Sequence, residues 1–302
     1  MSYRILVLDG ITERGMQLLK AEGWTIDSRK SMPPSELAAM IAPYHAIMVR
    51  SASQITAEVL DAAANLRIIG RPGVGVDNVD LDAATRRGVV VMNSPGGNLV
   101  STAELTLALL LAVARNIPQA DAAMKKERWE RKAFAGVELH GKRIGVIGLG
   151  RVGREVAARC QKLGMEVVGF DPFVSQAVAE TLGVHLLPLD ELLGGSDFLT
   201  LHTTLTPESR HLLGKDAFSR VKPGIRIVNA ARGELIDEAA LLEALETGRV
   251  AAAALDVHAH EPPDDWAWLG TPGSWPRPTS APPRSRRRSA WARTSRCRSA
   301  TT

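Results

Sequence analysis

The sequence predicts an α/β fold of two doubly wound parallel-sheet domains, followed by a C-terminal tail without regular structure. Short apolar runs alternate with helical patterns along most of the chain, and each run is apolar throughout. Such runs are typical of parallel strands that helices cover on both faces. From Thr271 to the end, in contrast, the chain has no Ile, Val, Leu or Phe. We therefore expect this segment to be disordered, with no core strand or amphipathic helix.

Length and composition set the broad class of protein. A chain of 302 residues is long enough for about two domains. No apolar run approaches the ~20 residues that span a bilayer, and the N-terminus lacks the layout of a signal peptide, so we expect no membrane partner. The two cysteines, Cys160 and Cys297, make no disulfide framework and fit a reducing cytoplasm. We expect Cys160 to be a packing residue, and we predict no metal site.

Charge is distributed unevenly along the chain. The net charge of +4 arises from the tail, which has eight Arg and no acidic residue after Gly270. The preceding part has 29 basic and 33 acidic residues and is mildly acidic. Basic residues near Trp275 and Trp291 would suit an arm that binds single-stranded nucleic acid. We favour an unstructured tail instead and expect no nucleic-acid partner.

The first 98 residues are expected to form one α/β unit. Thr56 is the expected cap of a helix that runs to Ala64, and Ser35 is a possible cap of the helix that Pro33 and Pro34 open. Further helices are predicted up to residue 22 and over residues 80–87. The predicted strands cover residues 4–8, 24–26, 46–49, 66–69 and 89–92.

A break that contains Pro and Gly, at residues 93–97, ends this unit. A long apolar helix is predicted from Leu99 to Asn116, where Pro118 limits it. Helices this apolar are usually buried on more than one face, so this one connects two domains or packs against a second subunit. We therefore expect a homodimer. The predicted parts are a first domain at residues 1–98, a second domain at 99–262 and the tail at 263–302.

The most informative stretch begins the second unit. An apolar strand at residues 143–147 leads through Gly148, Gly150 and Gly153 into a helix, and a second strand then ends at Asp171. Glycines in this context form the dinucleotide-binding fingerprint of a Rossmann domain, since they let the backbone approach a pyrophosphate at the helix N-terminus. Asp171 follows the last glycine by 18 residues and can accept hydrogen bonds from the ribose hydroxyls. Because its charge would repel a 2′-phosphate, the predicted cofactor is NAD.

Later strands of this unit are predicted at residues 198–201, 225–228 and 251–255. In doubly wound sheets, ligands lie beyond the carboxyl ends of the strands. The short segments at residues 202–204, 229–233 and 256–257 should therefore converge on the cofactor and on the group that reacts with it.

Arg232 lies just past a predicted buried strand. A guanidinium there can bind a carboxylate through two parallel hydrogen bonds or polarise a keto oxygen. An Arg in such a place is also often paired with a surface acid, and Glu261 alone would be a solvated carboxylate. The residues by themselves thus indicate an NAD-binding protein with an anion-binding Arg near the nicotinamide.

The sequence resembles the NAD-dependent D-2-hydroxyacid dehydrogenases on motifs that run in order to about Pro263. These are VRS (49–51), GRPGVGVDNVD (70–80), NSPGGN (93–98), WERKAF (129–134), GLGRVGREVA (148–157), HTTLTP (202–207), NAARGELIDEAAL (229–241) and ALDVHAHEPP (254–263). Within the family, the motifs are most similar to those of members that oxidise 3-phospho-D-glycerate. The resemblance implies a flavodoxin-like substrate domain, a Rossmann NAD domain and oxidation of this acid to 3-phosphohydroxypyruvate for serine biosynthesis.

The resemblance also implies roles for individual residues. Arg232 would hold the substrate carboxylate and keto oxygen, and Glu261 would orient a catalytic histidine and raise its pKa. The implied cofactor contacts are Gly148, Gly150, Arg151, Val152, Gly153, Asp171, Thr203, Ala230, Arg232 and Asp256. The implied substrate contacts of the first domain are Arg50, Val74, Gly75 and Asn98.

The catalytic histidine of the family is missing. It follows the glutamate by about twenty residues in a Pro-His-Leu-Gly-Ala-Ser-Thr run, whereas this sequence has Thr279 at that place. His258 and His260 lie near Glu261 but on another part of the path from strand to loop, so we expect neither to replace it. The family's last core helix, which packs on the substrate domain, is absent too, so apolar surface should be exposed there.

The expected function is therefore that of an impaired dehydrogenase, because loss of a general base should slow the chemical step by ~10²–10⁴. The alternatives are a dehydrogenase or reductase of another D-2-hydroxyacid, such as those of glyoxylate or hydroxypyruvate, and an NAD-binding protein without turnover.

The genetic code offers an explanation for the tail. The residues TPGSWPRPTSAPP at 271–283 can be encoded by a series of GC-rich codons. If the base before this series is a C and translation begins at that C, the same bases encode HPGVVATPHLGAS. This contains most of the missing motif. We hypothesise that the reading frame shifts just before Thr271 and that the tail is an out-of-frame translation, from a mutation or a sequencing error.

Resequencing the gene tests this hypothesis. We expect a neighbouring frame in which the codons around residues 271–283 encode the His-Leu-Gly-Ala-Ser run. A gene with an intact frame and no such alternative near Thr271 would contradict the hypothesis.

Overall fold

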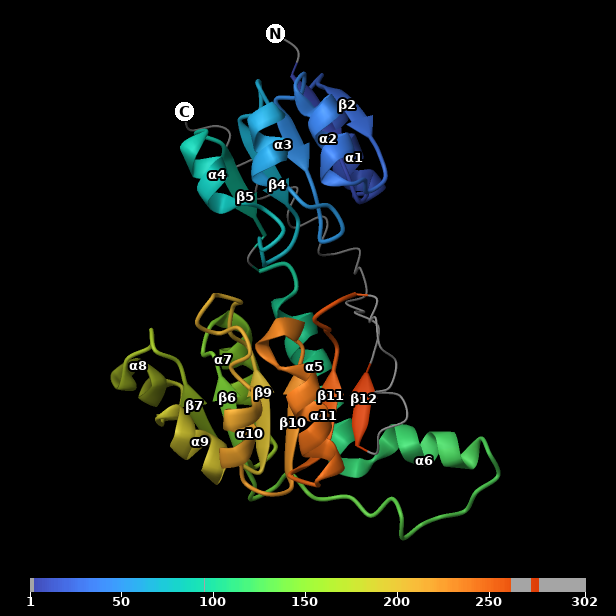
Figure 1. Cartoon of the computed structure of the whole chain (residues 1–302), viewed down its shortest axis with the longest axis vertical. Helices are drawn as coiled ribbons and strands as arrows, with labels where there is room; N and C mark the ends of the chain where they lie inside the picture. The colour runs from blue at the N-terminus through green and yellow to red at the C-terminus, as the bar shows by residue number, and fades with distance from the viewer. Residues whose placement is uncertain (1–2, 95, 262–272, 277–302) are drawn as a thin grey trace. The chain divides into compact units, whose positions relative to one another are not determined.

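The computed structural model describes residues 3–94, 96–261 and 273–276. The chain divides into two compact units between Asn98 and Leu99. Each unit is built on one parallel β-sheet with helices packed against it (Figure 1). The predicted α/β class with two parallel sheets is confirmed.

Unit 1 contains a five-stranded sheet in the order β2-β1-β3-β4-β5. Its strands are β1 (Arg4–Val7), β2 (Thr25–Ser28), β3 (Ala46–Met48), β4 (Ile68–Arg71) and β5 (Val90–Asn93). Its helices are α1 (Glu13–Lys20), α2 (Pro34–Ile41), α3 (Ala57–Ala62) and α4 (Leu81–Arg86). This order is that of flavodoxin-like sheets, in which ligands lie at the carboxyl ends of the strands.

The two faces of this sheet are not covered equally. Successive strand residues point to opposite faces, so Leu6 packs in the core under α2, α3 and α4, whereas Ile5 and Val7 pack towards α1. On the α1 face, the paired residues Ile68 and Val90 are 42% and 56% exposed. The prediction of a sheet covered on both faces is thus wrong for β4 and β5. The order of strand addition reverses after β2, so that β3, β4 and β5 are added on the other side of β1. Among the described residues, α1 is the only helix of unit 1 on the face where Ile68 and Val90 lie.

Side-chain caps explain where several helices begin. Thr56 accepts a hydrogen bond from the Val59 N–H, and this confirms the predicted cap of α3. The predicted cap at Ser35 is wrong. Helix α2 begins at Pro34, and the cap position lies two residues earlier than predicted, at Pro33, which makes no side-chain hydrogen bond. Proline is well suited to the first helical position because its φ is fixed and it has no N–H to satisfy.

Unit 2 contains a seven-stranded parallel sheet in the order β12-β11-β10-β9-β6-β7-β8. Its strands are β6 (Arg143–Ile147), β7 (Glu166–Phe170), β8 (His185–Leu186), β9 (Phe198–Leu201), β10 (Ile225–Asn229), β11 (Val250–Leu255) and β12 (Ser274–Pro276). Its helices are α5 (Leu99–Arg115), α6 (Ile117–Met124), α7 (Arg151–Lys162), α8 (Gln176–Thr181), α9 (Leu189–Gly195), α10 (Lys215–Arg220) and α11 (Glu238–Glu246), with a 3-10 turn η1 (Gly233–Leu235). The order reverses between β6 and β9, which is the switch point of a Rossmann sheet.

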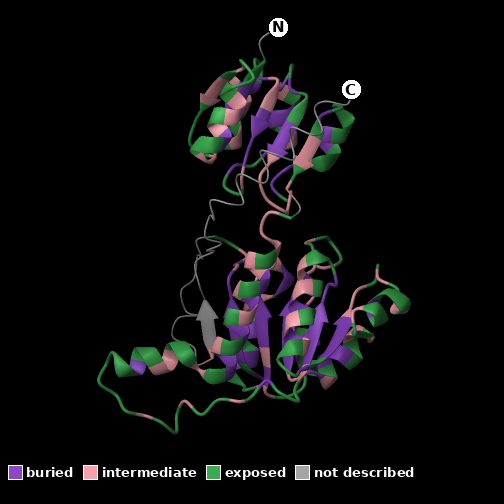
Figure 2. Ribbon diagram, turned by 180° about the vertical axis from the view of Figure 1, so that it is seen from behind, coloured by how far each residue is buried: buried purple, intermediate pink, exposed green. Residues whose placement is uncertain are grey.

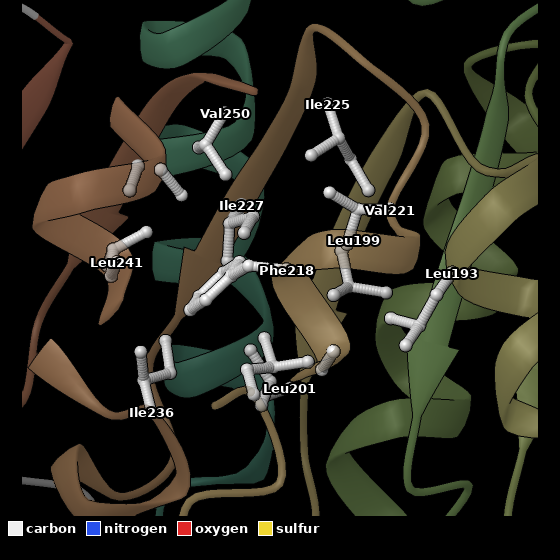
Figure 3. Packing of buried hydrophobic residues seen from close by; sticks show 14 of the residues in the cluster. Leu193, Leu199, Leu201, Phe218, Val221, Ile225, Ile227, Ile236, Leu241 and Val250 are labelled. Carbon is white, nitrogen blue, oxygen red and sulfur yellow. The ribbon is translucent and has the colours of Figure 1, made fainter. Parts of the chain in front are cut away.

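Both faces of this sheet are packed. Helices α5, α7 and α8 contribute to the core on one face, and α9, α10 and α11 to the core on the other. The central strands are buried, while the outer sides of the helices are exposed (Figure 2). Phe218 of α10 and Leu241 of α11 pack beside Ile227 of β10 (Figure 3). This packing fixes the strand ends that carry the candidate site.

The long apolar helix ends one residue earlier than predicted, at Arg115. Asn116 adopts a left-handed conformation with φ 50°, and the chain then continues as α6, with Pro118 in its first turn. Pro118 therefore lies inside a second helix, which the sequence did not predict. In the described part of the chain, no single helix is long and apolar enough to cross a membrane. Only α5 and α6 together would meet that test, and they are bent by 64°.

Most of the predicted tail lies outside the described residues. The exception is β12, which pairs in parallel with β11. The expectation of a disordered tail is therefore wrong at Ser274–Pro276, although β12 is an edge strand and not the core strand that we expected to be missing. Pairing at the edge of a sheet requires backbone hydrogen bonds, such as that from the Ala253 N–H to the Gly273 carbonyl at 2.8 Å, and edge strands tolerate proline.

Cys160 lies on the buried side of α7 and is fully enclosed. Burial raises the pKa of its thiol to about 12. A thiol in this environment stays protonated at neutral pH and is a poor nucleophile. This supports the prediction that Cys160 is a packing residue.

Candidate functional site

The turn between β6 and α7 brings backbone atoms so close that side chains are excluded. Gly148 has φ +92°, and a Cβ there would lie 2.7 Å from the carbonyl carbon of His202. A Cβ on Gly153 would lie 1.9 Å from the carbonyl oxygen of Gly148. These two glycines therefore allow α7 to start directly beyond the end of β6, at the switch point of the sheet.

Gly150 differs from these glycines because no atom lies within 4 Å of a Cβ built on it. It is the residue before α7, whose first turn begins with Arg151 and Val152. The first N–H groups of a helix have no intrahelical acceptor and favour an anion. The open space at Gly150 therefore fits a pyrophosphate that approaches the backbone where α7 begins.

Asp171 lies directly after β7 and beside the glycine turn. Its Oδ2 accepts a hydrogen bond from the Leu149 N–H at 2.8 Å, and its Oδ1 accepts one from the Phe173 N–H at 2.9 Å. Each carboxylate oxygen can accept a further bond. The half-buried carboxylate is thus held next to the turn, where it fits the ribose of an adenine dinucleotide. The residues present fit NAD.

The other predicted cofactor residues lie at the same edge of the sheet. Thr203, Ala230 and Asp256 follow the carboxyl ends of β9, β10 and β11. These strands pair in register, with Asn229 opposite Leu201 and Leu255. Thr203 and Ala230 are half-buried, and Asp256 is buried. The fold therefore aligns the three strand ends that the sequence placed around the nicotinamide.

Arg232 and Glu261 lie on two loops that touch each other. A Cβ on Gly233, next to Arg232, would lie 2.0 Å from the carbonyl carbon of His258. The Glu261 Oε1 accepts a hydrogen bond from the His258 N–H at 3.2 Å. The two predicted catalytic residues thus lie close to the same backbone segment at His258, although Arg232 and Glu261 are 29 positions apart in the sequence.

The sequence did not predict how this segment is held. Glu238, in the first turn of α11, accepts a hydrogen bond from the Ala259 N–H at 3.1 Å. The His258 side chain is 4% exposed, and its Nδ1 lies 3.7 Å from the same carboxylate. His258 is therefore a buried part of the loop, while His260 is exposed. That neither histidine replaces the missing base stays a prediction.

His202 is a further histidine at the switch point, and the sequence did not single it out. Its Nε2 lies 2.9 Å from the Thr200 Oγ1, and burial of the imidazole lowers its pKa to about 4. A group with this pKa is neutral at pH 7 and a weak base. His202 thus supports the glycine turn and is poorly suited to take the substrate proton.

The predicted substrate residues lie at the carboxyl edge of the unit 1 sheet. Arg50 follows β3 and is half-buried, and its N–H donates to Asp9 Oδ2 at 2.8 Å. Val74 and Gly75 follow β4, and the Val74 carbonyl accepts a hydrogen bond from the Asn93 side chain at 2.6 Å. Asn98 ends the unit, and its buried Oδ1 has no hydrogen-bond partner in the described part of the chain.

Within the described ranges, no group of three or more His, Cys, Asp and Glu side chains is arranged to hold a metal ion.

Comparison with known proteins shows the family. Residues 107–276 match the family model of the D-isomer specific 2-hydroxyacid dehydrogenase, NAD binding domain. The chain is 53% identical over 260 residues to D-3-phosphoglycerate dehydrogenase from Archaeoglobus fulgidus, an alignment of 86% of this chain and 49% of that protein. The chain thus spans about half the length of the curated relatives it matches.

Solved structures share the fold. The TT0316 protein from Thermus thermophilus is 34% identical, with a TM-score of 0.87 over 96% of this chain and 93% of the other. A glyoxylate reductase from Paecilomyes thermophila is 27% identical, with a TM-score of 0.88 over 96% and 92%.

A pair of alanine substitutions tests the glycine turn. Gly153→Ala should destabilise the chain by about 1–3 kcal/mol, because the new methyl group meets a backbone oxygen that has no room to move. Gly150→Ala should leave stability within about 1 kcal/mol. It should nevertheless weaken NAD binding at least tenfold, because the methyl group fills the space of the pyrophosphate. Urea unfolding and NAD titration measure the two effects. Unchanged NAD affinity in Gly150→Ala would place the pyrophosphate elsewhere.

His202 predicts a specific dependence of stability on pH. Between pH 6.5 and about 4, the unfolded chain binds a proton that the folded chain excludes. Stability should therefore fall as the pH decreases through this window, with a contribution from His202 on the order of 3 kcal/mol. The variant His202→Gln, which cannot titrate, should show a shallower decrease in urea unfolding between pH 7 and pH 4.5. Equal slopes for both chains would show that this imidazole is not protected from protonation.

Proposed function

The chain belongs to the D-isomer specific 2-hydroxyacid dehydrogenases, and on that basis we propose that its function is the NAD-dependent oxidation of 3-phospho-D-glycerate. The product is 3-phosphohydroxypyruvate, and the reaction serves serine biosynthesis. The single observation that carries the proposal is the glycine turn with Asp171 at the switch point of unit 2. The similarity to a D-3-phosphoglycerate dehydrogenase supports the choice of substrate.

Unit 2 binds NAD and unit 1 binds the substrate. When bound, NAD would supply the acceptor for the hydride that leaves C2 of the hydroxyacid. Gly150, Arg151 and Val152 would hold its pyrophosphate, and Asp171 would accept hydrogen bonds from its ribose. The remaining cofactor contacts are Gly148, Gly153, Thr203, Ala230, Arg232 and Asp256.

Arg232 binds the carboxylate of the substrate and the oxygen on C2. Its guanidinium suits this role because it presents parallel N–H donors and keeps its charge at all physiological pH values. The contact of Gly233 with His258 fixes the loop that carries Arg232. The substrate residues that we propose in unit 1 are Arg50, Val74, Gly75 and Asn98.

The proton of the substrate hydroxyl lacks its usual acceptor. In relatives with the complete motif, a histidine paired with the glutamate takes this proton. Here Thr279 occupies that place in the sequence, and Glu261 instead accepts a hydrogen bond from a backbone N–H. We therefore propose impaired turnover. An NAD-binding protein without turnover is the second candidate function, and the same observation favours it.

Another D-2-hydroxyacid is the alternative substrate. The structural similarity to a glyoxylate reductase supports glyoxylate or hydroxypyruvate as substrates of the reverse reaction. The common features of these acids are a carboxylate and an oxygen on C2, which Arg232 recognises equally in all of them.

We also propose a homodimer in the cytoplasm, with no membrane or nucleic-acid partner. Exposed apolar side chains on α5 and α6 support a second subunit, since Leu111, Ile117 and Met124 are all more than two-fifths exposed.

Formation of NADH from 3-phospho-D-glycerate tests the proposal. The test uses a frame-corrected chain in which HPGVVATPHLGAS replaces residues 271–283. One version includes the change Thr279→His, and the other has the same replacement but retains Thr279. The comparison isolates the contribution of the histidine as the base. We expect turnover in the first and a rate lower by ~10²–10⁴ in the second, with NAD affinity unchanged. Equal rates would show that the histidine is not the base. Turnover of glyoxylate or hydroxypyruvate but not of the phosphorylated acid would favour the alternative substrates.

A further inference from the structure

Unit 1 contains a cavity of about 550 Å³, and Arg50 is its only lining residue that has one of the family roles above. Three chain segments line it, at residues 9–10, 28–31 and 50–52. They follow the carboxyl ends of β1, β2 and β3, which are neighbours in the sheet. Ligands of doubly wound sheets bind at this edge.

The charge of the cavity is positive. Arg29, Lys30 and Arg50 line it together with a single acid, Asp9, which leaves a net charge of +2. The Asp9 carboxylate is already engaged: Oδ2 accepts from the N–H groups of Arg50 and Ser53, and Oδ1 accepts from the Ser53 hydroxyl at 2.7 Å. It therefore serves the backbone of the two loops.

The three cations form no close ion pair, although the charge of Arg29 contributes to lowering the pKa of Asp27. In the described part of unit 1, none of their side chains forms a hydrogen bond or an ion pair within 4 Å. Asp27, two positions before Arg29, accepts hydrogen bonds from Tyr44 at 2.7 Å and Arg4 at 3.1 Å, and these bonds lower its pKa. Asp27 is thus a carboxylate that already has other partners.

The walls of the cavity are held in place without a ligand. The Ser31 hydroxyl donates to the Ala52 carbonyl at 3.1 Å and joins the loop after β2 to the loop after β3. The Arg29 N–H donates to the Val7 carbonyl at 2.9 Å. Arg50 is fixed on its other side by Asn78, whose side chain donates to the Arg50 carbonyl at 2.6 Å. A preformed site loses little free energy through ordering when it binds.

We propose that this cavity is an anion subsite for the phosphate group of a phosphomonoester substrate. Arg29 and Lys30 are its specificity-determining residues, and Arg50 joins them to the substrate residues at the strand ends. A phosphomonoester carries a charge close to −2 at pH 7, which matches the cavity. Guanidinium groups bind phosphate oxygens in pairs, and Ser28 and Ser51 line the same space with hydroxyls that can donate further hydrogen bonds. The inference rests on the proposed function and extends it, because it explains how phosphorylated and plain hydroxyacids are distinguished.

Calorimetric titration of the intact chain in the presence of NAD tests this subsite. The probes are 3-phospho-D-glycerate, D-glycerate and inorganic phosphate. The test variant is Arg29→Gln with Lys30→Gln. The matched control is Lys20→Gln with Arg86→Gln, which removes the same charge from the last turns of α1 and α4. Helices in such a unit run antiparallel to the strands, so these residues lie at the opposite edge of the sheet.

We expect the test variant to bind 3-phospho-D-glycerate at least tenfold more weakly than the unmodified chain and the control do. Its affinity for D-glycerate should be unchanged. Inorganic phosphate should compete with 3-phospho-D-glycerate in the unmodified chain.

Three outcomes would overturn the inference. These are unchanged affinity of the test variant for 3-phospho-D-glycerate, equal affinity of the unmodified chain for the two acids, and binding of inorganic phosphate without competition, which would indicate an isolated anion site. NAD titration of the same samples separates the two levels of the account. Loss of NAD binding in the unmodified chain would contradict the proposed function, whereas normal NAD binding with any of the three outcomes would contradict the subsite alone.

Discussion

The contact between Gly153 and the carbonyl oxygen of Gly148 is the constraint on which unit 2 depends. Any side chain at Gly153 would overlap that oxygen, so the first turn of α7 can lie against the end of β6 only with glycine there. Because α7 begins so close to the end of β6, there is open space at Gly150, beside the first N–H groups of α7. Asp171 then completes the arrangement through its hydrogen bond with Leu149. Cofactor binding is therefore a direct consequence of how a strand and a helix are joined.

Local signals predicted the parts of the fold that local physics determines. The cap of α3 by Thr56 and the glycine turn between β6 and α7 could both be predicted, because each depends on residues that are close together in the sequence. The exposure of Ile68 and Val90 depends on which helices reach one face of the sheet, and strand β12 depends on an open edge of β11. A single sequence carries little information on either. With the GC-rich codons assumed above, the frame shifted by one base would encode Val-Val-Ala where β12 forms, which is a typical strand sequence.

The candidate site divides in the same way. Motifs identified Arg232 and Glu261, yet their common contact with the His258 segment, and the support of that segment by Glu238, required the structure. The basic cavity of unit 1 was missed for a similar reason. Arg29, Lys30 and Arg50 belong to two different loops, and they gather because β1, β2 and β3 are neighbours in the sheet. The available signal was a basic pair, Arg29 and Lys30, that begins three positions after the predicted strand at residues 24–26.

The choice of cofactor follows most directly from the position of Asp171, so comparative titration of the intact chain with NAD and NADP is the most direct test of the account. A carboxylate beside the ribose accepts hydrogen bonds from two hydroxyls but repels a 2′-phosphate. The account predicts that NAD binds and that NADP binds at least about tenfold more weakly, a difference of about 1.4 kcal/mol. Failure to bind NAD, or equal affinity for both dinucleotides, would contradict it.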